Sequence, residues 1–178
     1  MGAGVGVGTG VGGGVVIGKR ILHGAHDTAA EIGHHVVHAN GPFCGCGQRG
    51  CLEAYASGTG IVKRTRSAMK SRGLSRLGTL DKSELTAKGI AAQARKGHAL
   101  ARKIMKETAY FLGLGLSNVV NILNPEMIVL SGGVSNNGDL LLPGARRVVK
   151  ERALAVAAGA IPIVVSRLGE DAVAQGGK

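Results

Sequence analysis

The first positions of the chain alternate between valine and small residues and then form a continuous apolar run. Residues 4–9 place valine at every second position, and residues 15–17 are all apolar, with a glycine-rich stretch between the two. A period of two on either side of a glycine turn is typical of a β-hairpin, whereas flexible linkers favour glycine and serine. The pattern therefore predicts a glycine-rich hairpin at the start of the chain.

The middle of the chain is predicted to be mainly helical. One strand is expected at residues 32–37, ended by Gly41-Pro42, and helices at residues 52–56, 60–69 and 83–95. The longest stripe of apolar residues at helical spacing runs over residues 99–123 and is typical of a buried helix. This apolar stripe could pack in the core of the protein or form a dimer surface. We expect the protein to be a homodimer.

Strands and helices alternate in the last third. Residues 127–130 are all apolar, as in a parallel strand buried on both faces, and they lead directly into Ser131-Gly132-Gly133. A helix at residues 145–157, a strand at residues 161–165 and the start of a helix at residue 171 follow. This alternation predicts an α/β fold.

Composition narrows the functional classes. Apolar residues make up 44% of the 178 residues, but with two Phe, two Tyr and no Trp the core must be aliphatic. The net charge of +11 comes from basic residues spread over helix-like segments without interleaved aromatics. We therefore expect solvated helix faces, with an anion-binding surface as the alternative and no nucleic-acid partner. The chain has no apolar run of membrane-spanning length and no signal peptide, so we expect a cytoplasmic protein without a membrane partner.

Three cysteines lie within eight positions, at Cys44, Cys46 and Cys51. Such a set cannot form a disulfide framework, and its glycine-rich, polar surroundings are unusual for buried structural cysteines. Three thiolates and one imidazole form a closed tetrahedral zinc site, which is structural because no position stays open for water. The spacing alone leaves the imidazole open among the histidines at positions 23, 26, 34, 35 and 38.

Two carboxylates flank this predicted zinc loop. Glu31 lies before it and Glu53 follows Cys51 by two positions. Metal binding would bring both towards one place, where fixed acceptors could hold the hydroxyls of a sugar. The alternative is that both are ordinary surface acids.

These motifs together resemble a known family. Glu31-Ile-Gly-His34, followed by Cys44-Gly-Cys46-Gly-Gln-Arg-Gly-Cys51-Leu-Glu53-Ala-Tyr-Ala-Ser57, resembles the signature of the ROK family of repressors and sugar kinases. Residues 8–14 resemble its second phosphate loop, residues 131–134 its adenosine-binding turn, and residues 168–172 the lead-in to its closing helix. The resemblance covers nearly the whole chain.

The resemblance implies an actin-like ATPase (ribonuclease H-like) fold, with ATP and a sugar bound between two lobes. It implies that Thr9 and Gly10 contact the nucleotide phosphates, and that Gly132 and Gly133 approach the adenosine. Its sugar ligands would be Glu31, His34 and Glu53. Its structural Zn²⁺ ligands would be His34, Cys44, Cys46 and Cys51.

Two parts of the family pattern do not occur in the sequence. We find neither the first Gly-Gly-Thr phosphate loop nor the Asn-Asp pair whose aspartate is the general base. We therefore expect residues 1–178 to form a single C-terminal kinase lobe, without the N-terminal lobe and the final helix, inactive alone.

The function expected of the parent protein is ATP- and Mg²⁺-dependent phosphorylation of a hexose, with glucose converted to glucose 6-phosphate. Kinases of N-acetylmannosamine, N-acetylglucosamine or fructose share these features. A sugar-responsive repressor of the same family is the alternative from another class, and a zinc-stabilised fragment without a function of its own is a third.

Overall fold

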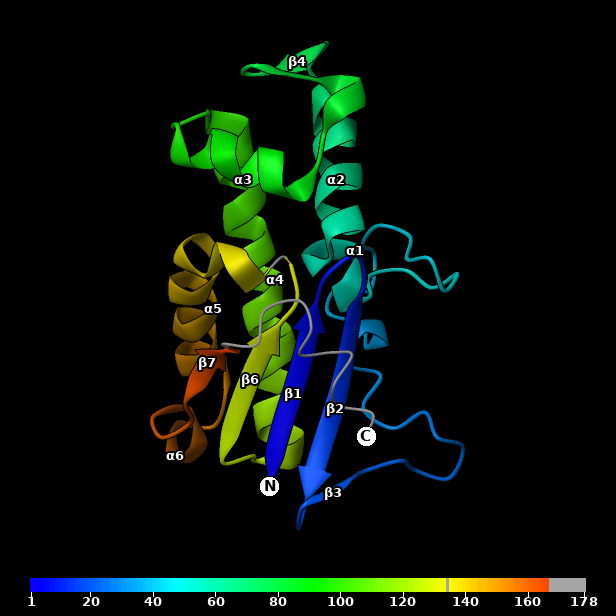
Figure 1. Ribbon diagram of the computed structural model, residues 1–178, viewed down its shortest axis with the longest axis vertical. Coiled ribbons are helices and arrows are strands. Elements are labelled where there is room, and N and C mark those ends of the chain that lie inside the picture. Colours follow the sequence, from blue (N-terminus) through cyan, green and yellow to red (C-terminus); the bar gives the residue numbers. More distant parts are fainter. Residues whose placement is uncertain (134, 167–178) are drawn as a thin grey trace.

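A five-stranded mixed sheet organises the molecule, as the computed structural model of residues 1–133 and 135–166 shows (Figure 1). The strand order is β3-β2-β1-β6-β7, with β1 antiparallel to β2, and β6 parallel to both β1 and β7. The strands are β1 (Gly2–Val7), β2 (Val11–Ile17), β3 (Arg20–Ile21), β6 (Met127–Ser131) and β7 (Ile163–Val165).

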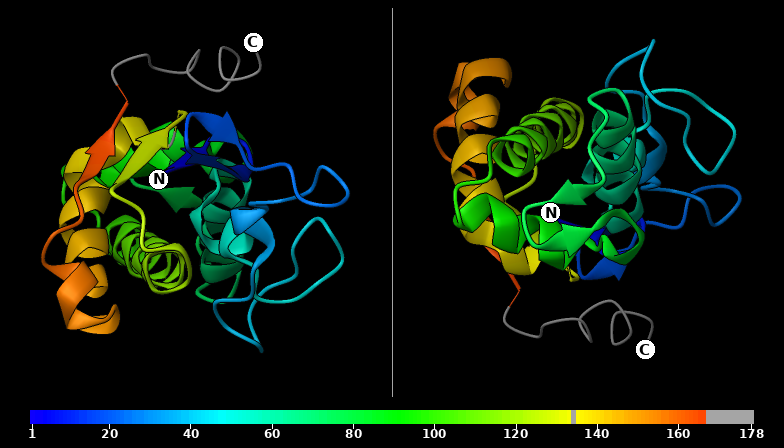
Figure 2. Two further views of the ribbon diagram at one scale, coloured as in Figure 1. Left: turned by 90° about the horizontal axis from the view of Figure 1, so that it is seen from below. Right: turned by 90° about the horizontal axis from the view of Figure 1, so that it is seen from above.

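Helices cover one face of this sheet and extend beyond its upper edge. The helices α4 and α5 lie on the same face, and no described helix covers the opposite face (Figure 2). Above the sheet, α2 and α3 carry a small two-stranded sheet, β4-β5 (Figure 1). The bounds are α1 (Leu52–Ala56), α2 (Gly58–Lys70), α3 (Ala87–Arg95), α4 (Ala99–Leu123), α5 (Gly138–Arg152), α6 (Ala155–Ala158), β4 (Arg76–Leu77) and β5 (Leu80–Asp81), with 3-10 turns η1 (Ile32–His34), η2 (Lys82–Glu84) and η3 (Ser135–Asn137).

The predicted hairpin is present as β1 and β2. Ala3, Val5 and Val7 point into the core and are at most 2% exposed, so the intervening glycines lie on the opposite face. Those glycines pair with glycines of β2, as Gly4 with Gly14. One face of the hairpin is therefore apolar, and the other presents mainly backbone.

The longest helix, α4, is a core element and has the predicted limits of residues 99–123. Its hydroxyl side chains are satisfied within the helix, because Thr108 and Ser117 donate hydrogen bonds to carbonyl oxygens one turn earlier. Gly113 allows α5 to approach closely, since a Cβ there would lie 2.6 Å from Cβ of Val148. Asn124 ends the helix in a left-handed conformation just before Pro125. Among the described residues, no helix is long and apolar enough to cross a membrane.

Several sequence predictions need correction. Residues 32–37 contain the turn η1 instead of a strand, because Gly33 packs directly against the backbone of β2. The helix α5 begins at Gly138 rather than at residue 145, although Pro143 and Gly144 lie inside it. The segment between the helices predicted at residues 60–69 and 83–95, for which no strand was predicted, contains β4 and β5. The helix expected from residue 171 lies outside the described residues.

Candidate functional site

The turn after β1, here called the first glycine turn (residues 8–10), is held by the start of α2. The Thr59 hydroxyl donates to the Thr9 carbonyl at 2.9 Å, and the Gly58 amide donates to the Gly8 carbonyl at 2.8 Å. Ser57 caps the helix by accepting from the Gly60 amide. The sequence analysis did not identify Thr59 as a site residue, because nothing local to it indicates a contact 50 positions away.

A second glycine turn (residues 132–133) follows β6 and lies beside the first. The strands β1 and β6 are parallel neighbours, so their carboxyl ends meet at one edge of the sheet. Gly132 has φ +88°, and a Cβ there would lie 2.7 Å from the Val7 carbonyl oxygen and 3.1 Å from the Gly8 nitrogen. The structure thus brings together the two turns that the family resemblance assigns to the nucleotide, at the edge where α/β proteins commonly bind ligands.

Two clefts open from these turns. A sheet cleft of about 880 Å³ is lined by the first turn, the glycine face of the hairpin, Glu53 and residues 131–133. A helix cleft of about 450 Å³ lies between the turns and the helices α2 and α3. Both volumes lie in the range of small-molecule sites.

Four side chains of the types that bind metals converge next to the sheet cleft. The ligand atoms of His34, Cys44, Cys46 and Cys51 all lie within 4.8 Å of one another. The Cys46 and Cys51 sulfurs are 3.7 Å apart, and Cys44 Sγ is 3.7 Å from His34 Nδ1. Tetrahedral zinc with normal bond lengths separates two sulfurs by about 3.8 Å, and a sulfur and a nitrogen by about 3.6 Å. The arrangement therefore fits zinc.

Glycines allow the cysteine loop (residues 44–51) to close this tightly. Gly47 and Gly50 have φ of +90° and +74°, in the left-handed region that disfavours other residues. A Cβ on Gly50 would lie 1.7 Å from the His38 carbonyl oxygen. The loop is also pinned by the Cys44 amide, which donates to the Gln48 carbonyl at 2.8 Å.

The three thiols differ in their acidity. Burial raises the pKa of Cys51 to about 12 and also raises the pKa of Cys44. A backbone hydrogen bond at Gln48 lowers the pKa of the exposed Cys46 to about 7. A metal that binds all three thiolates must therefore displace protons from Cys44 and Cys51 at neutral pH.

The structure distinguishes His34 from its neighbour His35. His34 turns Nδ1 towards Cys44, and its Nε2 lies 4.0 Å from a carboxylate oxygen of Glu31. His35 instead contacts the Ile32 carbonyl through Nδ1, and its buried Nε2 has no partner among the described residues. Burial lowers the pKa of His35, as expected for a neutral core imidazole.

Glu53 connects the cysteine cluster to the first glycine turn. One carboxylate oxygen accepts from the Val11 amide at 3.0 Å, and the other lies 3.4 Å from the Cys44 sulfur. Gly10 is required for this approach, because a Cβ there would lie 2.6 Å from the Glu53 carboxylate. Cys44 thus lies next to both Glu53 and His34, and His34 faces Glu31, so the three predicted sugar ligands are near one another.

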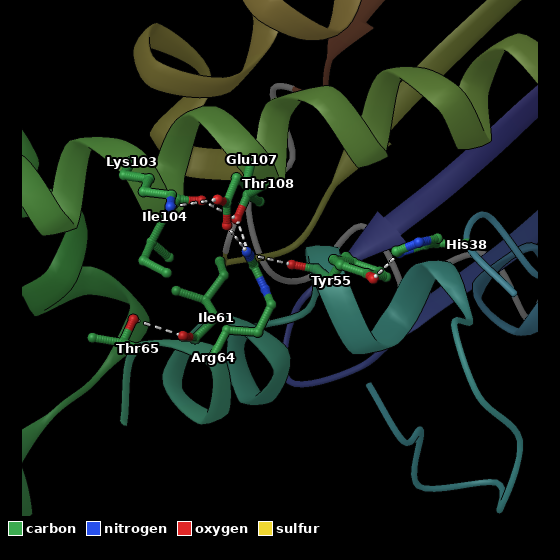
Figure 3. Close-up of polar contacts among 9 residues, drawn as sticks. All are labelled: His38, Tyr55, Ile61, Arg64, Thr65, Lys103, Ile104, Glu107 and Thr108. Atoms are coloured by element: carbon green, nitrogen blue, oxygen red, sulfur yellow. Dashed lines mark hydrogen bonds and ion pairs between the residues drawn. The ribbon is translucent and has the colours of Figure 1, made fainter. Parts of the chain in front are cut away.

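The helix that carries Glu53 is fixed by a buried arginine that the sequence analysis did not identify (Figure 3). Arg64 of α2 donates to the Tyr55 carbonyl at 2.9 Å, to the Glu107 carboxylate at 3.1 Å and to the Thr108 hydroxyl. Burial lowers the pKa of the Arg64 guanidinium, and the charge of Glu107 acts in the opposite sense. Arg64 therefore ties α1 to α2 and α4.

An aromatic contact supports the same helix. The Tyr55 ring stacks on Phe111 of α4 with centroids 3.6 Å apart. The Tyr55 hydroxyl is 2.8 Å from Nδ1 of His38, which precedes the cysteine loop (Figure 3). The α1 helix is thus fixed on both sides, which limits the positions that the Glu53 side chain can take.

The chain matches a known protein family along nearly its whole length. The model of the ROK family matches residues 3–178. The chain belongs to the ROK family. This membership and its structural neighbours also establish the expected α/β fold of the actin-like ATPase type.

ROK proteins similar to this chain include both enzymes and regulators. A glucokinase of Halalkalibacterium halodurans is 40% identical over 99% of this chain and 53% of its own length. A xylose repressor of Caldicellulosiruptor bescii is 32% identical over 92% of this chain and 41% of its own. The crystal structure of a ROK family glucokinase from Streptomyces griseus, in complex with glucose and AMPPNP, superimposes with a TM-score of 0.79 at 30% identity, covering 96% of this chain and 56% of that one.

The chain spans about half the length of the relatives it matches. Both sugar kinases and repressors are among these relatives.

Proposed function

We propose that this chain is the C-terminal lobe of an ATP-dependent hexose kinase, with glucose as the first substrate to test. The observation that carries the proposal is the position of Glu53, which contacts both the amide that directly follows the first glycine turn and a cysteine of the cluster assigned to zinc. A sugar acceptor and a phosphate-binding turn lie next to each other in this arrangement, as phosphoryl transfer requires.

The nucleotide would lie along the two glycine turns. Backbone N–H groups of a tight glycine turn bind anions, and this role suits Thr9 and Gly10 at the phosphates. Gly132 and Gly133 carry no side chain that would block adenosine. Mg²⁺ would accompany ATP and neutralise charge on its phosphates.

The sugar hydroxyls would form hydrogen bonds with the side chains of Glu31, His34 and Glu53. His34 suits this role because its Nδ1 faces the cysteines, which leaves Nε2 on the side of Glu31. Zn²⁺ held by His34, Cys44, Cys46 and Cys51 would fix the loop and take no part in the chemistry. The general base that removes the proton of the attacking hydroxyl would come from the other lobe.

Binding tests the proposal on this chain, and turnover tests it on the protein that includes the preceding segment. Calorimetry should detect glucose and AMPPNP binding to the zinc-loaded chain. Glu53→Gln, which keeps the shape of the side chain, should weaken glucose binding by about tenfold. The exposed Glu84→Gln is the matched control and should bind as the wild type does.

Each outcome has a clear meaning. Binding of both ligands, with glucose-dependent ADP release by the longer protein, supports the kinase. If the chain binds neither ligand, the proposal is wrong.

A sugar-responsive repressor is the second candidate, favoured by the similarity to the Caldicellulosiruptor bescii repressor. A regulator needs the sugar site but not phosphoryl transfer. Sugar binding without AMPPNP binding or ADP release would therefore favour this class.

A further inference from the structure

The helix cleft carries a cluster of positive charge that the proposed function does not use. Its lining includes Lys63 and Arg66 of α2 and Lys88 of α3, together with the first and second glycine turns. No aspartate or glutamate lines this cleft. The positive charge of the cleft is therefore not balanced by acidic residues in its lining.

Within the described part of the chain, these three cations have no structural partners. Among the described residues, none of Lys63, Arg66 and Lys88 makes a side-chain hydrogen bond or ion pair, and all three are exposed. Some surface cations are paired, as Arg95 is with Asp139 at 2.6 Å, whereas others, such as Arg72, have no partner among the described residues. Since stability alone would favour separating like charges, an anionic ligand is the simplest reason for gathering them in one cleft.

The geometry of α2 directs this charge to the first glycine turn. Thr59, Lys63 and Arg66 follow one another at helical spacing, so they share one face of the helix. Thr59 donates its hydroxyl to the Thr9 carbonyl at 2.9 Å. This row of side chains therefore starts at the first glycine turn and runs away from it along the helix cleft.

We propose that Lys63, Arg66 and Lys88 bind the polyphosphate chain of the nucleotide and make affinity depend on the number of phosphates. This inference rests on the proposed nucleotide site and adds specificity-determining residues to it. A compact trio of cations recognises charge rather than the base, so inorganic triphosphate should compete with ATP for the cleft.

The test compares phosphate ligands on the 178-residue chain by calorimetry. Wild-type affinity should rise from AMP through ADP to ATP, and inorganic triphosphate should displace ATP. The double variant Lys63→Met/Arg66→Met should lose about tenfold in ATP affinity and less than about twofold in AMP affinity. The matched control is Lys70→Met/Arg72→Met, which removes the same charge from exposed positions at and just beyond the end of α2 and should leave ATP binding unchanged.

Any of five results would overturn the inference. One is that Lys63→Met/Arg66→Met loses equal affinity for AMP and ATP. Another is that the control loses as much ATP affinity as this variant, because ATP binding would then depend only on the overall charge of the protein. The third is wild-type ATP binding that triphosphate does not displace. If the wild type binds no nucleotide at all, the proposed function fails together with the inference, whereas intact ATP binding in all variants refutes the inference alone. The single variant Lys63→Arg, which keeps the charge, should retain most of the wild-type affinity for ATP.

Discussion

Replacing Arg64 by methionine should destabilise the protein more than its place on a solvent-facing helix suggests. Its side chain is only 11% exposed and serves three acceptors from two helices. Methionine would keep most of the aliphatic volume, so the variant loses hydrogen bonds and an ion pair without creating a large cavity. The carbonyl of Tyr55, a residue only 6% exposed, would lose its donor, which costs about 1–2 kcal/mol.

The lost ion pair adds to this cost, with a discount for exposure. Glu107 is 41% exposed and lies 3.8 Å from Lys103, so its charge remains partly solvated and partly paired without Arg64. We assign this contribution about 1 kcal/mol, because exposed pairs contribute little. Thr108 keeps its bond to the Ile104 carbonyl and adds no further cost. The total is about 2–3 kcal/mol, or a fall in Tm of about 5–10 °C for a chain of this size.

Urea unfolding with saturating zinc measures this difference directly. Arg72→Met is the control, because Arg72 is exposed and its side chain has no partner among the described residues. It should change the free energy of unfolding by less than about 0.5 kcal/mol. Arg64→Lys should fall between the two, since one ammonium cannot reproduce the forked geometry. If Arg64→Met is as stable as Arg72→Met, the network in Figure 3 does not hold α1 as described.

Three further perturbations test other parts of the structure. Gly33→Ala places a Cβ 1.9 Å from a backbone oxygen of β2 and should cost about 3 kcal/mol in the free energy of unfolding, whereas Gly12→Ala meets nothing within 4 Å and should cost far less. A chelator should lower the Tm of the wild type by at least about 5 °C but leave that of Cys51→Ser, which lacks one ligand, almost unchanged; equal responses in calorimetry would argue against zinc in the cluster. Hydrogen bonds from Arg95 lower the pKa of Asp139 below its unfolded value, so this pair stabilises the protein above about pH 4 and the effect is lost as pH falls further. Asp139→Asn should therefore show a smaller loss of stability in urea titrations between about pH 5 and pH 3, by less than about 1 kcal/mol because both groups are exposed.

Local patterns allowed much of the fold to be predicted. The hairpin and α4 depend on periodicities within single segments, and the cysteine cluster depends on closely spaced residues. The Arg64 network was not predictable in this way, because Glu107 lies 43 positions away in the sequence. The limits of α5 were wrong because Pro143 and Gly144 disfavour a helix locally, while burial of residues such as Leu141 and Val148 against the core stabilises it.

The candidate site was predictable in its residue types and less so in its contacts. Choosing His34 over His35 required the family resemblance, since both are adjacent imidazoles with the same reach. The turn at residues 32–34, where a strand was expected, is set by contact with β2, which no pattern within that segment encodes. The conformation of residues 32–34 thus depends on packing between segments that are distant in the sequence, which local patterns do not predict.

The shared contacts of Glu53 have a practical consequence for anyone who purifies this protein. Because the same carboxylate touches a cysteine of the cluster and an amide next to the first glycine turn, a change in metal content should alter ligand affinity. Two batches of equal purity would then differ in apparent AMPPNP affinity whenever they differ in retained zinc. Metal analysis of each batch would separate such variation from true differences between variants, and added zinc should bring the batches into agreement.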